Sequence, residues 1–170
     1  AEGYATDFLD ILSSLTAPLA QQRQLKIITN AGGMNPQACA KDAAKILSAA
    51  GLADLPLAVV SGDDLLPLIE QLMAAGCEFK NLDTGEPLCE LQSAIVSANA
   101  YLGARPITEA LARGGRIVIT GRVADASLTL GPAMHAFDWQ WDDWDKLAAA
   151  SVAGHLIECG AQVTGGYSVD

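Results

Sequence analysis

The chain has little charge, few aromatic residues and no long hydrophobic run. Charged residues make up 18% and aromatic residues 5% of its 170 residues, whereas hydrophobic residues make up 51%. A chain this rich in apolar residues predicts a folded domain with a buried core. No apolar run approaches the roughly 18 residues of a membrane-spanning helix, so we expect no contact with a membrane. The opening AEGYATDFLD carries acids and no basic residue, which argues against a signal peptide.

Positive charge is also scarce. Ten Lys and Arg residues face 20 Asp and Glu residues, which gives a formal net charge of −10 at pH 7. A strongly acidic surface repels the phosphate backbone of nucleic acids. We therefore expect no nucleic-acid partner.

The four cysteines form no CxxC pair and no local metal-ligand spacing. Without an export signal, and with a core large enough to need no disulfide bonds, they are interpreted as reduced thiols. This interpretation predicts a cytoplasmic protein with no metal site. The cysteines are Cys39, Cys77, Cys89 and Cys159.

Short apolar runs alternate with segments of helical periodicity along the chain. Pro18 breaks the first helix, Pro36 suits a first helical turn, and Gly51 and Gly76 suit helix ends. The expected strands are 25–30, 56–61, 93–99 and 116–120, and the expected helices are 7–22, 36–50, 62–76, 105–113, 125–136 and 143–160. Asp125 is expected to cap the fifth helix, and Asp142 or Asp143 the last.

This alternation predicts an α/β fold. Continuous apolar strands separated by helices are typical of a mostly parallel sheet. We expect one domain over residues 1–170, with four or more strands flanked by helices in a Rossmann-like, three-layer arrangement. Right-handed crossovers then bring every strand-to-helix loop to one edge of the sheet.

Three of these loops carry glycine, amide or guanidinium groups: ITNAGGMNP (28–36), IVSANAYLGARP (95–106) and IVITGRVADAS (117–127). Ligands of open α/β sheets bind outside the carboxyl ends of the strands. Glycine lets the backbone approach a ligand, helix N-termini favour anions, and arginine pairs with them. We therefore expect a site for an anionic or thioester small molecule, formed by Asn30, Gly32, Gly33, Asn35, Asn99, Arg122 and Ser127.

A simpler interpretation stays open, because any tight strand-to-helix turn uses Gly and Asn. The loops match neither GxGxxG nor GxxxxGK[ST], so no dinucleotide or ATP is indicated and the cofactor is unknown. Asp63, after the second strand, resembles a ribose-binding acid, but helix capping by Asp63 and Asp64 explains it more simply.

A second cluster lies in GHLIECGAQVTGG (154–166). His155, Glu158 and Cys159 share one side of the last helix, where His and Glu suit proton transfer and a thiol suits nucleophilic attack. The alternative is that His155 and Cys159 continue an apolar stripe. We take Asp125, His155 and Glu158 as the candidate catalytic residues, and expect the same crevice to hold His155 and Glu158. The Trp-rich segment 137–146 predicts a core lid or a homo-oligomer contact.

Four stretches resemble the acyclic terpene utilisation protein A family: TNAGGMNPQACA, SANAYLGARPI, VITGRVADASLTLGPAMHAF and WDKLAAASVAGHLIECGAQVTGG. The resemblance runs from about Ile27 to Gly166. It implies a cytoplasmic protein of citronellol and geraniol breakdown, a pathway of branched acyl-CoA thioesters. It also implies a longer parent protein, so we expect the chain to be a fragment of the N-terminal part.

Two functional hypotheses follow. In the first, the chain is an enzyme, or its catalytic half, that acts on a branched acyl-CoA or terpenoid acid through the strand-end loops. In the second, it is a non-catalytic binding or assembly module of the same pathway. The resemblance implies a pathway and no particular reaction.

Overall fold

A computed structural model describes residues 2–90 and 95–165. Its centre is a sheet of three parallel strands, β1 (Ile27–Thr29), β2 (Leu57–Val60) and β3 (Ile117–Thr120), in the order β1-β3-β2. Ile28 and Ala58 both pair with Val118, so β3 is the central strand. All four residues of β3 are buried, which explains why its sequence is a continuous β-branched run.

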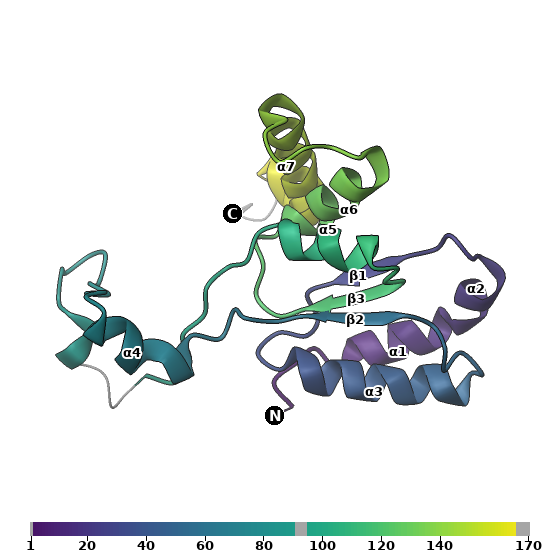
Figure 1. Ribbon diagram of the computed structural model, residues 1–170, viewed down its shortest axis with the longest axis horizontal. Coiled ribbons are helices and arrows are strands. Elements are labelled where there is room, and N and C mark those ends of the chain that lie inside the picture. The colour runs from purple at the N-terminus through teal and green to yellow at the C-terminus, as the bar shows by residue number, and fades with distance from the viewer. Residues whose placement is uncertain (1, 91–94, 166–170) are drawn as a thin grey trace.

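Helices cover both faces of the sheet, which makes three layers (Figure 1). On one face lie α1 (Asp7–Ser14), α2 (Thr16–Gln21) and α3 (Pro36–Ala49), and on the other lie α5 (Arg105–Ala112) and α6 (Ser127–Phe137). Successive side chains of a strand point to opposite faces. Ile117 and Ile119 accordingly pack with Leu12 of α1, and Val118 packs with Ile107 of α5.

The helix ends agree with the sequence signals. The first helix breaks at Leu15 and restarts at Thr16, as Pro18 predicts. Asn35 caps α3 because its Oδ1 accepts a hydrogen bond from the Ala38 N–H at 3.2 Å. Gly51 follows α3 with a φ of +75°, the left-handed conformation that glycine adopts most readily.

The predicted fourth strand is not confirmed. Residues 95–98 lie in no strand, and residues 93 and 94 lie outside the described residues. Asn99 forms only an isolated antiparallel bridge with Asp64. The described part of the sheet therefore has three parallel strands, and the expected sheet of four or more strands is not confirmed.

Between β2 and α5 the chain leaves the sheet and forms a separate lobe (Figure 1). The lobe contains η1 (Leu66–Leu68), α4 (Ile69–Ala74) and η2 (Leu88–Glu90). The predicted helix 62–76 is thus shortened to residues 66–74. Asp63 is used in contacts elsewhere, whereas Asp64 Oδ1 accepts a hydrogen bond from the Leu66 N–H at the start of η1. Gly76 follows α4 with a φ of +96°, as its predicted role as a helix terminator requires.

The last helix, α7 (Trp144–Cys159), packs on α6 and continues into η4 (Gly160–Thr164). Its N-cap position is Asp143, as predicted, but the Asp143 carboxylate accepts from Gln140 N–H and Lys146 instead of capping α7. The predicted cap of α6 is wrong: Ala126 holds the N-cap position and Asp125 precedes it in a turn. No helix in the described residues is long and apolar enough to cross a membrane.

Candidate functional site

The loops after β1 and β3 meet in an open pocket of about 740 Å³ at the carboxyl edge of the sheet. Asn30, Gly33 and Met34 line it from the first loop, and Arg122 lines it from the loop after β3. The N-terminal segment 2–6 forms a further wall. The structure thus brings together three of the predicted site residues: Asn30, Gly33 and Arg122.

At each glycine of the first loop, a larger residue would be sterically unfavourable. A Cβ on Gly32 would come within 2.4 Å of the Thr120 carbonyl oxygen and 2.6 Å of the Pro36 Cβ. Gly33 has a φ of +52°, and a Cβ there would lie 3.0 Å from the Gly3 carbonyl oxygen. Gly32 therefore lets the loop pack against the end of β3, while Gly33 turns the chain into the pocket.

A buried carboxylate joins the other two loops. Asp63 Oδ2 accepts hydrogen bonds from the Arg122 backbone N–H at 2.9 Å and from Asn99 Nδ2 at 3.1 Å. The Asp63 carbonyl oxygen accepts from the Ala100 N–H at 2.8 Å. Asp63 therefore caps no helix. It holds the segment around Asn99 against the loop after β3, and Asn99 is oriented toward Asp63.

The Arg122 side chain makes two contacts with Tyr101. Its Nη2 donates to the Tyr101 hydroxyl at 2.7 Å, and its guanidinium carbon lies 5.0 Å from the centre of the Tyr101 ring. The Tyr101 contact, with smaller contributions from Asp125 and Asp63, raises the pKa of the Arg122 guanidinium above its ordinary value. The cation of the pocket is therefore charged at every physiological pH.

The N-terminal wall is tied to α3 and the first loop by hydrogen bonds. Tyr4 donates its hydroxyl proton to Asp42 Oδ2 at 2.6 Å, and this bond raises the pKa of Tyr4 to about 12. Asn35 Nδ2 donates to the Glu2 carbonyl oxygen at 3.2 Å. The Asn35 Oδ1 thus caps α3, and its Nδ2 anchors the N-terminal segment, so both polar atoms of the side-chain amide make structural hydrogen bonds.

The comparisons with known proteins decide the family. The sequence pattern of the acyclic terpene utilisation family protein AtuA matches residues 1–170. The chain belongs to this family. The match confirms the family resemblance seen in the sequence. No curated protein and no solved structure matches the chain.

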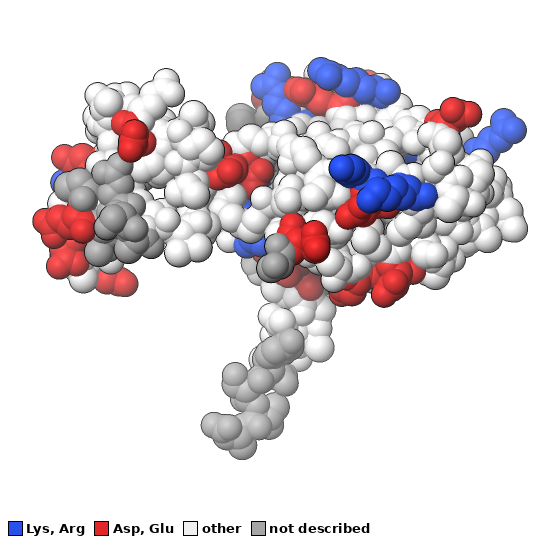
Figure 2. Space-filling view, turned by 90° about the horizontal axis from the view of Figure 1, so that it is seen from below, with Lys and Arg blue, Asp and Glu red and all other residues white. Residues whose placement is uncertain are grey.

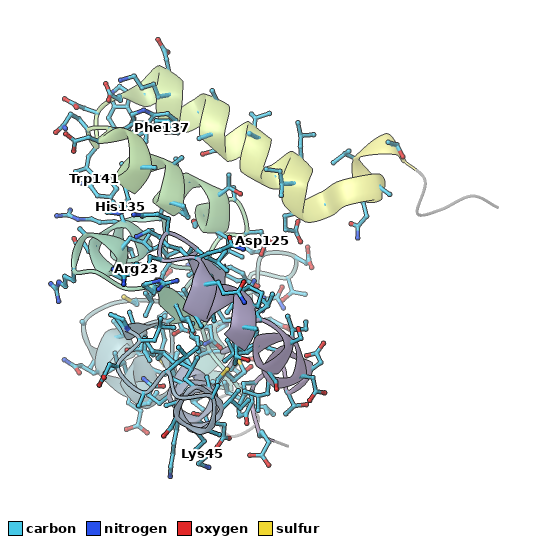
Figure 3. All side chains as sticks on the ribbon, turned by 90° about the vertical axis from the view of Figure 1, so that its right-hand side faces the viewer. Arg23, Lys45, Asp125, His135, Phe137 and Trp141 are labelled. Atoms are coloured by element: carbon cyan, nitrogen blue, oxygen red, sulfur yellow. The ribbon has the colours of Figure 1, made fainter. Side chains whose placement is uncertain are left out.

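The remaining predicted residues of this AtuA family chain lie outside the pocket lining. Ser127 is buried in the first turn of α6. Asp125 is exposed and close enough to influence both the Arg122 guanidinium and the Cys159 thiol. Figure 3 shows Asp125 below α7, at the side of the sheet. Asp125 is therefore the only one of the predicted catalytic residues that the described contacts connect to Arg122.

His155 and Glu158 are not among the residues that line the pocket. Exposed His155 lines a shallow pocket with Val152 and Leu156 on α7. Glu158 accepts a hydrogen bond from Cys159 Sγ at 3.2 Å. This bond, followed by burial, raises the pKa of the Cys159 thiol, which keeps the thiol protonated and disfavours a nucleophilic role.

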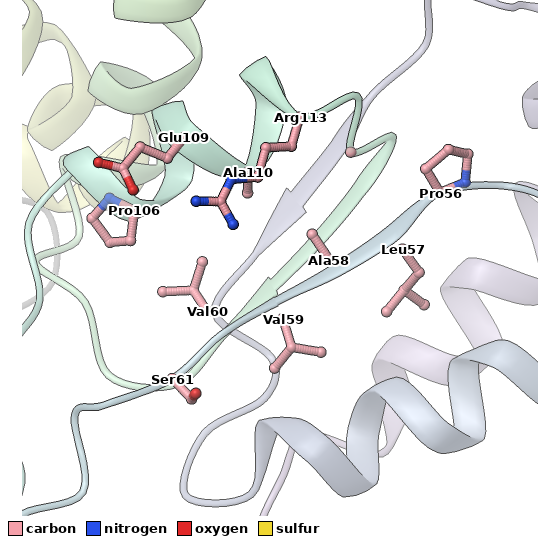
Figure 4. Close-up of a pocket in the computed structure, with 11 residues that line it drawn as sticks. Pro56, Leu57, Ala58, Val59, Val60, Ser61, Pro106, Glu109, Ala110 and Arg113 are labelled. Carbon is pink, nitrogen blue, oxygen red and sulfur yellow. The ribbon is translucent and has the colours of Figure 1, made fainter.

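A second hollow, of about 350 Å³, lies between β2 and α5 (Figure 4). Its floor is the free edge of β2, and Pro106, Glu109 and Arg113 of the α5 region border it. Ala58 and Val60 point toward α5 in Figure 4, whereas Leu57 and Val59 point to the opposite face. This hollow is an open sheet edge, and none of the predicted site residues lines it. Within residues 2–90 and 95–165, no group of three His, Cys, Asp or Glu side chains could hold a metal ion.

Sequence reasoning missed the parts that build the pocket from outside the three loops. The N-terminal segment has no motif, and neither Tyr4 nor Tyr101 belongs to one. The sequence indicated Asp63 only as a ribose-binding acid or a helix cap, and it did not predict that Asp63 is buried. Its position directly after a strand could have placed it near the other loops, since such positions share one edge of a parallel sheet.

Proposed function

We propose that the chain binds the anionic or thioester end of a branched acyl-CoA or terpenoid acid during the cytoplasmic breakdown of acyclic terpenes. The observation that carries this proposal is the convergence of Asn30, Gly33 and Arg122 in one pocket. Membership of the AtuA family supports the terpene part of the proposal.

The chemistry of the lining suits such a ligand. Arg122 uses one N–H on Tyr101, which leaves further guanidinium donors for a carboxylate or phosphate. Asn30 adds an amide donor and acceptor, and Gly33 lets the N-terminal segment lie close against the first loop. Met34 and Ala31 supply apolar surface for a branched hydrocarbon.

Proton transfer in this proposal belongs first to Asp125. Its carboxylate acts on Arg122 electrostatically, so it is the candidate acid or base next to a bound anion. His155 and Glu158 join it only if the ligand extends from the pocket past Asp125 to the end of α7.

The proposal is tested by titrating the labelled protein with inorganic phosphate, CoA and geranyl-CoA while amide chemical shifts are recorded. We expect the shifts to cluster at 30–34 and 121–125. Arg122→Gln should weaken binding by about 10- to 100-fold, because it removes a charge-assisted hydrogen bond of about 1.5–3 kcal/mol.

Arg113→Gln is the matched control, since Arg113 lines the hollow along β2 and the substitution removes the same charge. An equal loss of affinity in both variants would mean that only the overall charge attracts the ligand. Shifts that cluster away from these loops would leave the loops as structural turns.

The second candidate function is a non-catalytic assembly module of the same pathway. It is favoured by α7, which leaves several apolar side chains exposed. Turnover of geranyl-CoA by the purified chain would exclude this alternative. Binding without turnover, together with co-purification of another enzyme of the pathway, would support it.

A further inference from the structure

Between Lys146 and Glu158, apolar residues lie on all sides of helix α7, yet the helix is buried on one side only. Of its 16 residues, only Ala150 and Gly154 are buried, and they face α6. A Cβ on Gly154 would lie 2.8 Å from the Ala126 carbonyl oxygen, so this side of α7 is closely packed. A helix that is apolar all round is normally buried on all sides.

The side of α7 away from α6 presents a contact face made of Ala148, Ala149, Val152, His155 and Leu156. The other four residues each lie three or four positions from Val152, so all five share one side of the helix. Val152 is 62% and Leu156 51% exposed. Figure 3 shows the C-terminal half of α7 extending beyond α6, and in Figure 2 the projection that leads to the grey C-terminal residues is largely uncharged.

The order of small and large residues on this face is self-complementary about Val152. Ala148 and Ala149 lie before Val152, and His155 and Leu156 lie at the same distances after it. When two identical helices pack antiparallel with their Val152 residues side by side, a residue that lies n positions before Val152 in one helix faces the residue n positions after Val152 in the other. His155 and Leu156 of one helix would then face the Ala148–Ala149 pair of the other.

We propose that this contact face is the interface with a second copy of the chain, in which two α7 helices pack antiparallel about a twofold axis beside Val152. Small residues opposite large ones allow the helix axes to come within the 8–10 Å of close helix packing. The proposal does not depend on the proposed function.

Charge also favours this face for self-association. The chain has a net charge of −10, so most surfaces of two copies repel one another. Between Lys146 and Glu158 the helix contains no Asp, Glu, Lys or Arg. Two copies can therefore bury this segment without removing a charged side chain from water.

Analytical ultracentrifugation over a concentration series tests the proposal. We expect a monomer–dimer equilibrium in the wild type, and Leu156→Glu should raise the dissociation constant roughly tenfold or more, since it places a charge in the contact. Ile157→Glu is the matched control: Ile157 is 70% exposed but lies outside the contact face. It should leave the equilibrium unchanged.

Two further sets of variants distinguish this geometry from non-specific association. Ala148→Leu should weaken the dimer by overpacking and Leu156→Ala by leaving a gap, whereas the double variant should restore it. Val152→Cys should form a disulfide-linked dimer on oxidation, because the two thiols meet at the twofold axis, and Ile157→Cys should not exceed the wild type. A wild type that stays monomeric at all concentrations, or equal effects of Leu156→Glu and Ile157→Glu, would overturn the proposal.

Discussion

Two apolar stretches of the same length differ completely in their surroundings. Ile117–Thr120 forms β3, whose residues are all buried, whereas residues 95–98 form no strand. Val118 is fully buried, while Val96 is 90% exposed. Both stretches contain an Ile-Val pair, so composition alone does not separate them.

The difference comes from what surrounds each stretch. β3 has β1 and β2 on its two edges and helices on both faces, so all its backbone groups and side chains find partners. Residues 95–98 belong to the chain segment that leaves the sheet after β2. One backbone hydrogen bond joins them to the start of that segment: the Leu65 N–H donates to the Ala98 carbonyl oxygen at 2.8 Å. An apolar run becomes a strand only where neighbouring strands are available to pair with it.

The largest expected effect tests this contrast directly. Ile119→Ala should lower the free energy of unfolding by about 2–5 kcal/mol, because it leaves a cavity between β3 and the α1–α3 layer. Val96→Ala should change it by no more than about 0.5 kcal/mol, as expected for an exposed side chain. Urea denaturation followed by circular dichroism measures both values.

Val96→Ala also tests whether residues 95–98 are exposed in solution. A loss comparable to that of Ile119→Ala would show that residues 95–98 pack against another surface in solution. In that case the contrast between the two stretches would be wrong, and the predicted fourth strand would have to be reconsidered.

The sequence predicted well those elements whose signals are local. Periodicity located α3, the Pro18 break located the boundary of α1 and α2, and glycine marked the ends of α3 and α4. It predicted strands 25–30, 56–61 and 116–120 because each is an apolar run between turn signals. It failed at 93–99, since pairing of a strand is a tertiary property that an apolar run does not encode.

The same distinction applies to the candidate site. Asn30, Gly33 and Arg122 were predicted to converge because strand-end loops share one edge of a parallel sheet. The role of Asp63 could not be predicted, because its carboxylate bonds Asn99 and Arg122, which lie 36 and 59 residues away. Asp125 was predicted as a cap from its place before an apolar helix, but the helix begins two residues later, at Ser127.

A smaller effect on stability is expected from alanine substitutions at two loop glycines, one packed against β3 and one not. Gly32 lies against the end of β3, where a Cβ would collide with the Thr120 carbonyl oxygen, whereas a Cβ on Gly103 would meet nothing within 4 Å. Gly32→Ala should cost about 1–3 kcal/mol, since the obstacle is backbone that cannot rotate away. Gly103→Ala should leave stability unchanged or slightly raised, because it restricts the unfolded chain.

Thermal unfolding of the two alanine variants measures this difference, and phosphate titration of each shows whether the pocket survives. Equal stability of the two variants would mean that the first loop can move away from β3. The glycine pair would then be needed only for the turn.

The smallest expected effect concerns a contact outside the core, the hydrogen bond between Tyr4 and Asp42. The bond to Lys45, followed by that to Tyr4, lowers the pKa of Asp42 below its ordinary 3.8, and the bond to Asp42 raises the pKa of Tyr4 from 10.0 to about 12. A carboxyl group with a lowered folded-state pKa stabilises the fold above pH 3.8, and this contribution is lost as the pH falls through the folded-state pKa. A phenol with a raised folded-state pKa stabilises the fold below pH 10, and this contribution is lost as the pH rises toward about 12.

The urea midpoint of the wild type should therefore fall at both ends of the pH range relative to Tyr4→Phe, which lacks the phenol and its bond. The two proteins should differ most between these limits, where the bond is intact, and the difference should shrink below pH 3.8 and above pH 10. Asp42→Asn should likewise remove the acid-side loss, because an amide does not titrate. A difference between wild type and Tyr4→Phe that stays constant from acid to alkaline pH would mean that the N-terminal wall of the pocket is held by its backbone bonds, such as Ala5 N–H to the Ala31 carbonyl oxygen, and not by this side-chain pair.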